Sequence, residues 1–237
     1  METLAADWQP AGQRLPPDQK LPAAPPLTVY RMAQTDFAPH EAALRELLTP
    51  AERARAARLA RLHDQSRFLV GRGCLRYLLG QRLEQAPTTI PLQLGRFGKP
   101  QLPRPAGVHF NVAHSGDWVL VAVGEREVGV DLEQQQPDFD FASVVAHCFS
   151  AAEQRGIYQS AEPREAFYSL WTRLEARAKA IGGGLSEDPT ATLTGGYIRP
   201  WAVHSFEVAP GYPGAVAYPA DWEPAVLFRT FEASLIS

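Results

Sequence analysis

The stretch that decides the fold is GVHFNVAHSGDWVLVAVGEREVGVDLE, which runs from Gly107 to Glu133. Short apolar runs alternate with turn residues in it, a pattern typical of β-strands. The pattern predicts turns at Ser115 to Asp117 and at Gly124 to Glu127. The three strands that it predicts are Val108 to Val112, Trp118 to Val123 and Val128 to Leu132.

The chain before this stretch carries one strand pattern and two helical patterns. LTVYRMA (Leu27 to Ala33) predicts a strand. Thr49-Pro50, an N-cap followed by proline at the first helical position, predicts the start of a helix. A second helix is expected from Asp64 to Arg82, and the two glycines inside it, Gly71 and Gly73, indicate close packing.

After the central stretch the chain is expected to be mainly helical from Phe139 to Ile181. Three further strands are expected at Ala202 to Val208, Gly214 to Tyr218 and Ala225 to Phe231. Helices followed by strands, twice over, predict an α+β protein with two similar halves. The expected division is an extended arm at 1–26, an N-terminal half at 27–124 and a C-terminal half at 125–237.

Composition and charge are those of an ordinary globular protein. The chain has 237 residues, 45% of them hydrophobic, and its net charge of −3 argues against a general nucleic-acid binder. The longest apolar run, Trp118 to Val123, is too short to span a bilayer, and no signal-peptide pattern opens the sequence. Cys74 and Cys148 lie far apart and are expected to be reduced. These features predict a cytoplasmic protein.

Positive charge is concentrated in one segment. Between Glu52 and Arg82, eight arginines stand against two acidic residues, Glu52 and Asp64, so the segment carries +6 in a chain of net charge −3. A solvated helix face is the usual outcome of such a run. The alternative is a surface that binds a polyanion, either a phosphorylated cofactor or an acidic protein.

Two carboxylates stand at the end of the third central strand, in Asp131-Leu132-Glu133. Residues two apart on a strand point to the same face, so Asp131 and Glu133 project together. A cation relieves their repulsion, and Mg²⁺ suits them because it binds one or two carboxylates together with substrate phosphates. The alternative is a solvated strand end, since a lone D-x-E pattern is common.

The helix predicted for FYSLWTRLEARAKAI, Phe167 to Ile181, has charged residues on both flanks. Glu175 and Lys179 lie together on one flank, and Arg173 and Arg177 lie on the other. Two interpretations are open: a surface ion pair, or a third metal ligand beside a phosphate-binding lysine. The apolar stripe expected to face the core consists of Phe167, Leu170, Trp171, Leu174, Ala178 and Ile181.

Four motifs follow one another along the chain. They are GKPQL (Gly98 to Leu102), FNVAHS (Phe110 to Ser115), VGVDLE (Val128 to Glu133) and WTRLEARAKAIGGGL (Trp171 to Leu185). In order and spacing they resemble the Sfp-type 4′-phosphopantetheinyl transferases. SRFLVGRGCLRYLLG (Ser66 to Gly80) is similar to the cyanobacterial heterocyst-associated branch of that family. The resemblance covers residues 27–231.

The resemblance implies a pseudo-twofold α+β fold that binds coenzyme A in the cleft between its halves. It assigns Mg²⁺, with Mn²⁺ as a substitute, to Asp131, Glu133 and Glu175. It assigns catalytic roles to Glu175, Glu153 and Lys179, and it places Lys179 at the phosphates of coenzyme A. The other residues that it assigns to coenzyme A are Gly98, Lys99, Asn111, Val112, Ala113 and His114, with Arg67, and behind it Arg61 and His63, at the ribose 3′-phosphate.

Three positions qualify this resemblance. The family places at Glu153 a carboxylate thought to help deprotonate the attacking serine, but Ser150 and Glu153 also form a capping-box pattern, and both interpretations stay open. Leu174 stands where the family usually has lysine, and Ala113 stands where it commonly has serine. The missing lysine removes a positive charge from a phosphate site, so reduced turnover or an altered carrier preference is an open alternative. Because the three carboxylates and Lys179 are intact, catalysis is expected.

The activity implied is transfer of 4′-phosphopantetheine from coenzyme A to a serine of an apo acyl or peptidyl carrier protein, with release of 3′,5′-ADP. The expected partners are coenzyme A and the carrier, without nucleic acid or membrane, and a monomer is expected. Phe139, Phe141 and Phe149 are expected in the core in preference to a docking patch. Two other classes stay open: a non-catalytic module that binds coenzyme A or a carrier, and a Mg²⁺-dependent nucleotide pyrophosphohydrolase.

Overall fold

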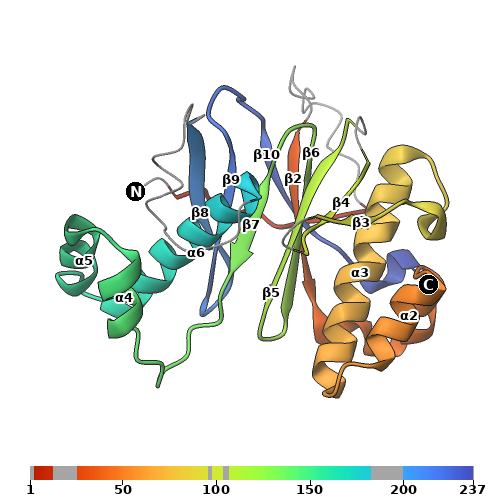
Figure 1. Ribbon diagram of the computed structural model, residues 1–237, viewed down its shortest axis with the longest axis horizontal. Helices are drawn as coiled ribbons and strands as arrows, with labels where there is room; N and C mark the ends of the chain where they lie inside the picture. Colours follow the sequence, from red (N-terminus) through yellow and green to blue (C-terminus); the bar gives the residue numbers. More distant parts are fainter. Residues whose placement is uncertain (1–2, 13–25, 96–97, 104–106, 183–199, 237) are drawn as a thin grey trace. The chain divides into compact units, whose positions relative to one another are not determined.

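The computed structural model describes residues 3–12, 26–95, 98–103, 107–182 and 200–236 (Figure 1). It is a mixed helix-and-sheet protein, as the sequence predicts. The elements in chain order are β1 (Gln9–Pro10), β2 (Leu27–Ala33), η1 (Gln34–His40), α1 (Glu41–Glu46), α2 (Pro50–Ala57), α3 (Leu62–Leu83), η2 (Pro87–Thr89), β3 (Gln93–Leu94), β4 (Pro100–Gln101), β5 (His109–Ser115), β6 (Trp118–Gly124), β7 (Gly129–Leu132), α4 (Ala142–Cys148), α5 (Ala151–Tyr158), α6 (Pro163–Ile181), β8 (Trp201–Ala209), β9 (Tyr212–Pro219), β10 (Val226–Thr230) and η4 (Ala233–Ile236).

The contacts of the chain divide it into two compact units. The five-stranded unit comprises Asp7–Arg126 and Glu223–Ser237, and the three-stranded unit comprises Met1–Ala6 and Glu127–Trp222. The strand predicted at the C-terminus is β10, which pairs in parallel with β2. The chain therefore returns to the five-stranded sheet at its end, whereas the sequence-based division kept 125–237 together.

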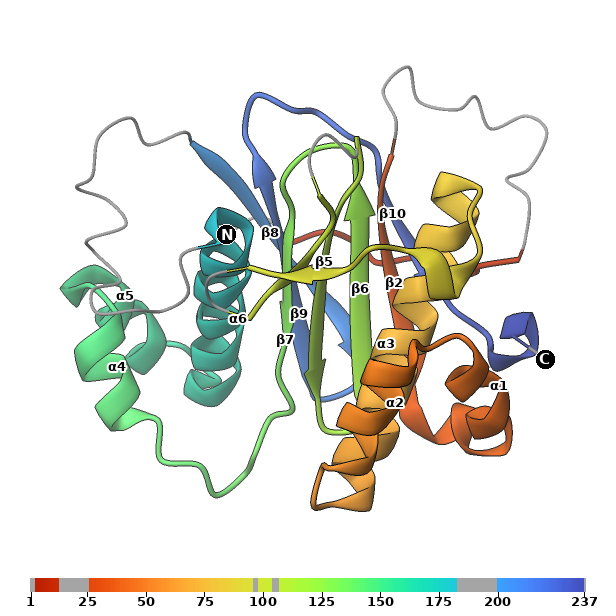
Figure 2. The ribbon, with the colours of Figure 1, turned by 45° about the vertical axis from the view of Figure 1, so that its right-hand side comes forward.

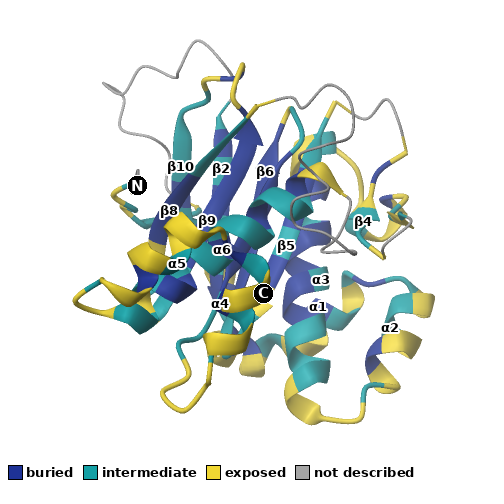
Figure 3. Cartoon of the chain, turned by 60° about the vertical axis from the view of Figure 1, so that its left-hand side comes forward, coloured by how far each residue is buried: buried dark blue, intermediate teal, exposed yellow. Residues whose placement is uncertain are grey.

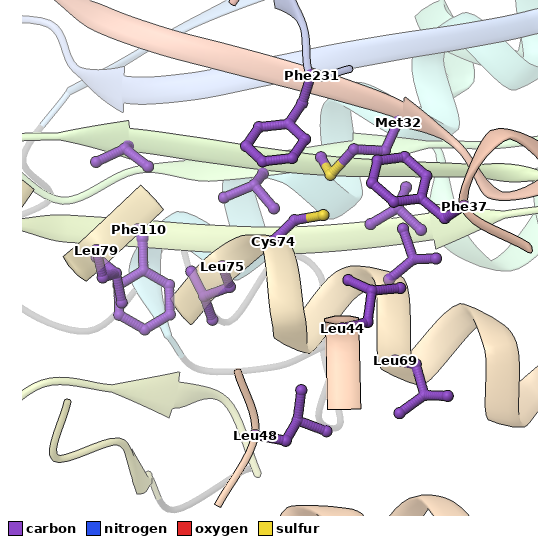
Figure 4. Close-up of a cluster of buried hydrophobic side chains, with 14 of the residues drawn as sticks. Met32, Phe37, Leu44, Leu48, Leu69, Cys74, Leu75, Leu79, Phe110 and Phe231 are labelled. Carbon is purple, nitrogen blue, oxygen red and sulfur yellow. The ribbon is translucent and has the colours of Figure 1, made fainter. Parts of the chain in front are cut away.

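The five-stranded unit is built on a sheet with the order β1-β10-β2-β6-β5. β6 pairs antiparallel with β2 on one side and with β5 on the other, and its apolar sequence is buried from Val119 to Gly124. Figure 3 shows β6 largely in the dark blue of buried residues. Side chains from the sheet, from α3 and from the segment after β10 meet in one core, where Cys74, Met32 and Phe231 lie together (Figure 4).

Local sequence signals set the helices of this unit. Thr49 is the N-cap of α2 and Pro50 takes the first helical position, as expected, and Thr49 also forms a capping box with Glu52. α3 runs beside the sheet, with α1 and α2 next to it (Figure 2). Gly73 marks close packing, because a Cβ there would lie 2.6 Å from Leu44 Cδ2. At Gly71 a Cβ would meet its nearest neighbour at an ordinary 3.5 Å, so that glycine is not required by packing.

The three-stranded unit has the sheet order β7-β9-β8, with α6 packed on all three strands. The buried face of α6 differs from the predicted stripe. Its side toward the sheet consists of small residues, Ala176 and Ala180, which pack with Ala215 and Ala217. The larger predicted residues Leu170, Trp171 and Leu174 pack instead on a cluster shared with α4 and α5, and Ile181 at the helix end is exposed.

Both units repeat one topology, which bears out the prediction of two similar halves. Each runs strand, helices, strand, strand, and in each the last strand lies between the other two: β2-β6-β5 in one unit and β7-β9-β8 in the other. All four pairings are antiparallel. β10 and β1 extend the first of these sheets by parallel pairing.

The predicted N-terminal arm includes two paired positions. Gln9–Pro10 form β1, and Thr3 makes a bridge to Ser205 of β8. Residues 13–25 of that arm lie outside the described part of the chain. Cys74 and Cys148 are both free thiols, as expected. Within the described residues, no helix combines the length and the apolar character needed to cross a membrane.

Candidate active site

The centre of the site is an ion pair between β7 and α6 in the three-stranded unit. Asp131 pairs across the sheet with Ala215, whose side chain packs under α6, so the Asp131 carboxylate points toward that helix. Lys179 of α6 donates to it, with 2.6 Å between Nζ and Oδ1. Only 4% of the Asp131 side chain is exposed, against 32% of the Lys179 side chain. The Asp131 carboxylate is thus buried with a cation at its side.

Small residues bring α6 this close to β7. Gly129 starts the strand, and a Cβ at that position would lie 1.9 Å from the Ala176 carbonyl oxygen and 2.4 Å from the Ala180 nitrogen. No side chain fits there, so the helix backbone rests directly on the strand. Glu175 and Lys179 each precede one of these alanines in the helix. The close approach therefore sets the distance at which their side chains meet β7.

The carboxylates of the site act on one another electrostatically. Burial raises the pKa of Asp131 to about 7; Lys179 opposes that rise, and the charges of Glu133 and Glu175 add to it. Burial also raises the pKa of Glu175, again with Lys179 opposing and Glu133 adding. The three predicted metal ligands and the predicted phosphate lysine therefore form one coupled group of charges.

The donor set fits a hard divalent cation. Asp131 Oδ2 is buried and has no hydrogen-bond partner among the described residues, so a strong acceptor is available there. The mutual repulsion of the carboxylates is relieved by positive charge, and Mg²⁺ takes such oxygens together with phosphates. Among the described residues, however, no three His, Cys, Asp or Glu side chains are close enough to form a ready-made metal cage. Ligation by Asp131, Glu133 and Glu175 together stays a prediction.

Glu153 lies at the start of α5, where the capping-box interpretation is confirmed. Its Oε2 accepts from the Ser150 backbone N–H at 2.8 Å and from the Ser150 hydroxyl at 2.6 Å. In return, the Ser150 hydroxyl accepts from the Glu153 N–H. Both bonds to the carboxylate use Oε2, so the cap does not engage Oε1. The predicted role of Glu153 as a base therefore does not compete with the cap for the same oxygen, and it stays a prediction.

Leu174 has a packing role in this chain. It lies half-buried against the cluster formed by Val145, Phe149, Ile157, Phe167 and Tyr168. Phe141 and Phe149 belong to the same aromatic packing, and Phe141 stacks on Phe167 with ring centroids 4.8 Å apart. Phe139 is 42% exposed but also contacts Phe167. The core interpretation of these phenylalanines is thus the better one.

The residues predicted to bind the nucleotide belong to the five-stranded unit. On β5, Phe110 and Val112 pack into the core with α3, so His114, two residues further, shares that face and is exposed. Asn111 and Ala113 are buried on the opposite face. The structure therefore does not direct the side chains from Asn111 to His114 to one side, and the set divides between the two faces of the strand.

The 3′-phosphate candidates cluster around the start of α3. His63 Nε2 lies 3.4 Å from Oδ1 of Asp117, which belongs to the turn that follows β5. The start of α3 and the end of β5, where His114 lies, are thus neighbours. Arg61 is exposed directly before α3, whereas Arg67 forms a 2.6 Å ion pair with Asp64. His63 therefore lies near the end of β5 that carries His114, and Arg67 has an acidic partner.

Gly98 and Lys99 lie on the hairpin between β3 and β4. Gly98 has a φ of 73°, in the left-handed region that favours glycine, and its N–H donates to the Gly95 carbonyl at 2.9 Å. The Gly95 N–H donates to the Lys99 carbonyl at 2.8 Å and closes the turn. The glycine is explained by this turn. A phosphate contact of Lys99 stays a prediction.

The arginines of the arginine-rich segment lie in two different environments. Arg72 and Arg76 are not on a solvated face: both bind Glu52, with contacts of 2.8 and 2.6 Å, and Arg76 is 2% exposed. Their ion pairs with Glu52 stabilise the packing of α2 on α3. In contrast, Arg58 and Arg61 are exposed and form no ion pair with the described residues. The exposed side of α2 is visible in Figure 3.

Two family models match this chain, one in each unit. The model described as "4'-phosphopantetheinyl transferase, N-terminal" matches residues 37–126, and the model of the 4'-phosphopantetheinyl transferase superfamily matches residues 127–211. The two matches meet between Arg126 and Glu127, where the contacts also divide the chain. The 4'-phosphopantetheinyl transferase psf-1 of Bacillus pumilus is 35% identical over 179 residues, which cover 70% of this chain and 76% of the relative. The chain belongs to the 4′-phosphopantetheinyl transferase superfamily.

Other relatives of this transferase come from different bacteria. The 4'-phosphopantetheinyl transferase HetI of a Nostoc strain is 33% identical over 146 residues, which cover 59% of this chain and 62% of the relative. The 4'-phosphopantetheinyl transferase Sfp of Bacillus subtilis is 27% identical over 183 residues, which cover 71% and 81%. These identities support the predicted Sfp-type resemblance. They do not separate the Nostoc relative from the Bacillus relatives.

Sequence reasoning identified the charged residues of the site but missed what positions them. Gly129 is the residue that lets α6 approach β7, and Ala176 and Ala180 are the residues that fit against it. The signal was present as two alanines four apart in the helix, a spacing that puts them on one face. A stripe chosen by hydrophobicity overlooks such small residues.

Proposed function

We propose that this transferase moves the 4′-phosphopantetheine arm of coenzyme A onto a serine of an apo acyl or peptidyl carrier protein and releases 3′,5′-ADP. The observation that carries the proposal is the 2.6 Å pairing of Lys179 with the buried Asp131 carboxylate, in a charge group that includes Glu133 and Glu175. A diphosphate suits this group, because phosphoryl transfer depends on positioning and on neutralising negative charge.

Each charged residue has a proposed task at the diphosphate. Asp131, Glu133 and Glu175 hold Mg²⁺ or Mn²⁺, and the unpartnered Oδ2 of Asp131 supports the choice of Asp131 as the anchor. When bound, the ion neutralises charge that develops on the diphosphate. Lys179 binds a phosphate oxygen. The carrier serine attacks the phosphorus that bears the pantetheine arm, and the bond between the two phosphates breaks.

The attacking serine must lose its proton. We assign Glu153 as the group that accepts this proton. The cap bonds use Oε2, so Oε1 is left for this task. The cap holds the side chain in one orientation, which lowers the entropic cost of using it as a base. Without a nucleophile of its own, the protein contributes position, charge and this proton acceptor.

The nucleotide end of coenzyme A is assigned to the five-stranded unit. His114, His63 and Arg61 lie around the end of β5 and the start of α3, which supports their assignment to the 3′-phosphate. Asn111, Val112 and Ala113 on the same strand, Gly98 and Lys99 on the β3–β4 hairpin, and Arg67 complete the proposed set. Of these, Arg67 has the weakest support, because its guanidinium already pairs with Asp64.

The carrier protein is assigned to the exposed part of the arginine-rich segment. Arg58 lies in the connection between α2 and α3, and Leu62 at the start of α3 is 80% exposed, while Arg61 in the same connection is assigned to the 3′-phosphate. Positive charge around an apolar side chain suits an acidic protein surface. The predicted carrier is therefore acidic near its modified serine. We further propose a cytoplasmic monomer that requires neither membrane nor nucleic acid.

Mass spectrometry tests the proposed function directly. The protein is incubated with coenzyme A, Mg²⁺ and several apo-carriers, and transfer adds one phosphopantetheine to the carrier and releases 3′,5′-ADP. The Asp131→Ala variant serves as the matched control and is expected to lose transfer. Binding of coenzyme A without a modified carrier, or release of product without any carrier, would contradict the proposal. Neither corresponding alternative, a binding module or a pyrophosphohydrolase, is supported by the relatives.

A further inference from the structure

The two oxygens of Asp131 have different surroundings. Oδ1 accepts from the Lys179 ammonium at 2.6 Å, whereas Oδ2 is buried without a hydrogen-bond partner among the described residues. Because only 4% of the Asp131 side chain is exposed, water has little access to this carboxylate and does not replace Lys179. The ammonium therefore already compensates the charge of this buried carboxylate.

We propose that Lys179 competes with the divalent cation for Asp131 and thereby makes metal binding depend on coenzyme A. Without the substrate, Lys179 compensates the buried carboxylate, and its positive charge repels a second cation. With the substrate, the diphosphate attracts the ammonium and supplies oxygens of its own to the ion. The first half of this inference concerns the free protein alone, and the second half rests on the proposed function.

Two further observations support this competition. Among the described residues no three acidic side chains, cysteines or histidines lie close enough to hold an ion, so the free protein shows no cage ready for metal. Lys179 contacts Asp131 directly, and its charge also opposes the rise in the pKa of Glu175, so it acts on both carboxylates. A single ammonium in this position reduces the attraction of the whole group for a cation.

Binding of Mn²⁺ to the free protein tests the inference, measured by electron paramagnetic resonance without coenzyme A or carrier. Lys179→Gln removes the charge and keeps a donor for Asp131, so its affinity for Mn²⁺ is expected to rise at least about tenfold. Lys179→Arg keeps the charge and is expected to bind Mn²⁺ as weakly as the native protein. The gain in affinity must disappear in the double variant that carries Lys179→Gln and Asp131→Asn. Its disappearance shows that the added Mn²⁺ binding occurs at Asp131 and not at another site.

An unchanged or lower affinity of Lys179→Gln would overturn the competition. If that variant unfolds more easily without metal, thermal unfolding supplies the second measurement: Mn²⁺ is expected to raise its melting temperature more than that of the native protein. Coenzyme A is expected to tighten Mn²⁺ binding in the native protein and much less in Lys179→Gln. Equal tightening in both would refute the substrate-dependent half, while the separate carrier-transfer assay decides the proposed function.

Discussion

The contact of Gly129 with α6 gives the sharpest prediction about the site. In Gly129→Ala the new Cβ would lie 1.9 Å from the Ala176 carbonyl oxygen, about 1.1 Å short of the 3.0 Å that real Cβ contacts keep. The obstacle is helix backbone, which cannot rotate away, so α6 must move by that amount. A movement of about 1 Å takes the 2.6 Å contact between Lys179 Nζ and Asp131 Oδ1 beyond the range of a good hydrogen bond.

Overpacking of this kind costs about 1 to 3 kcal/mol of unfolding free energy, and we expect transfer to fall with it, because Lys179 and Glu175 move with the helix. Urea unfolding measures the first effect and carrier modification the second. Gly156→Ala is the matched control: nothing lies within 4 Å of its Cβ in α5, so the helix should gain about 0.5 to 1 kcal/mol and transfer should persist. A Gly129→Ala protein with native stability and native transfer would show that the close approach does not position the site.

Three further predictions test other features. The pKa of Asp131 is raised from 3.8 to about 7, so its contribution to stability is present below pH 4 and is lost as the pH rises through 7. In urea unfolding without metal, Asp131→Asn should flatten this pH dependence of the unfolding free energy. An unchanged slope would contradict the prediction. Glu153→Gln should keep the helix cap but lower transfer, whereas Glu153→Ala should also lose about 1 kcal/mol of stability; full transfer by the Gln variant would exclude the base role. Arg76→Met should lower the free energy of unfolding by about 3 to 5 kcal/mol, because it leaves Glu52 without this buried partner. Arg82→Met removes an exposed ion pair and should lower it by less than about 1 kcal/mol. Equal losses of stability would disprove the distinction between the two pairs.

Features set by neighbouring residues could be predicted from the sequence. The apolar run from Trp118 to Val123 indicated a strand, and the structure forms it as β6. The capping boxes at Thr49 and Ser150 depend on residues three apart, and both are formed. The shared face of Asp131 and Glu133 follows from strand alternation alone. In each of these cases the deciding interaction is local, so no knowledge of the tertiary structure was needed.

Features set by distant residues could not be predicted in the same way. Glu52 takes Arg72 and Arg76 as partners because α2 packs on α3, and charge counting alone gave those arginines to a solvated or anion-binding face. The buried side of α6 was also misjudged, because the partner surface that selects it, with Ala215 and Ala217, lies on a strand far along the chain. Small residues carry little hydrophobic signal, although they decide how closely two backbones approach.

The two units share one topology but differ in their acidic residues, so the acidic residues indicate function better than the fold does. In the five-stranded unit, the strand equivalent to β7 is β2, which carries no acidic residue, and the equivalent helix α3 buries Arg76 against Glu52. In the three-stranded unit, β7 and α6 bury Asp131 against Lys179. Both units therefore bury an ion pair, between two helices in the first and between a strand and a helix in the second. In the first, both Glu52 oxygens are satisfied by arginines, which favours stability. In the second, Asp131 keeps one buried oxygen without a partner among the described residues, and this supports the proposal that a metal and a diphosphate bind in the three-stranded unit.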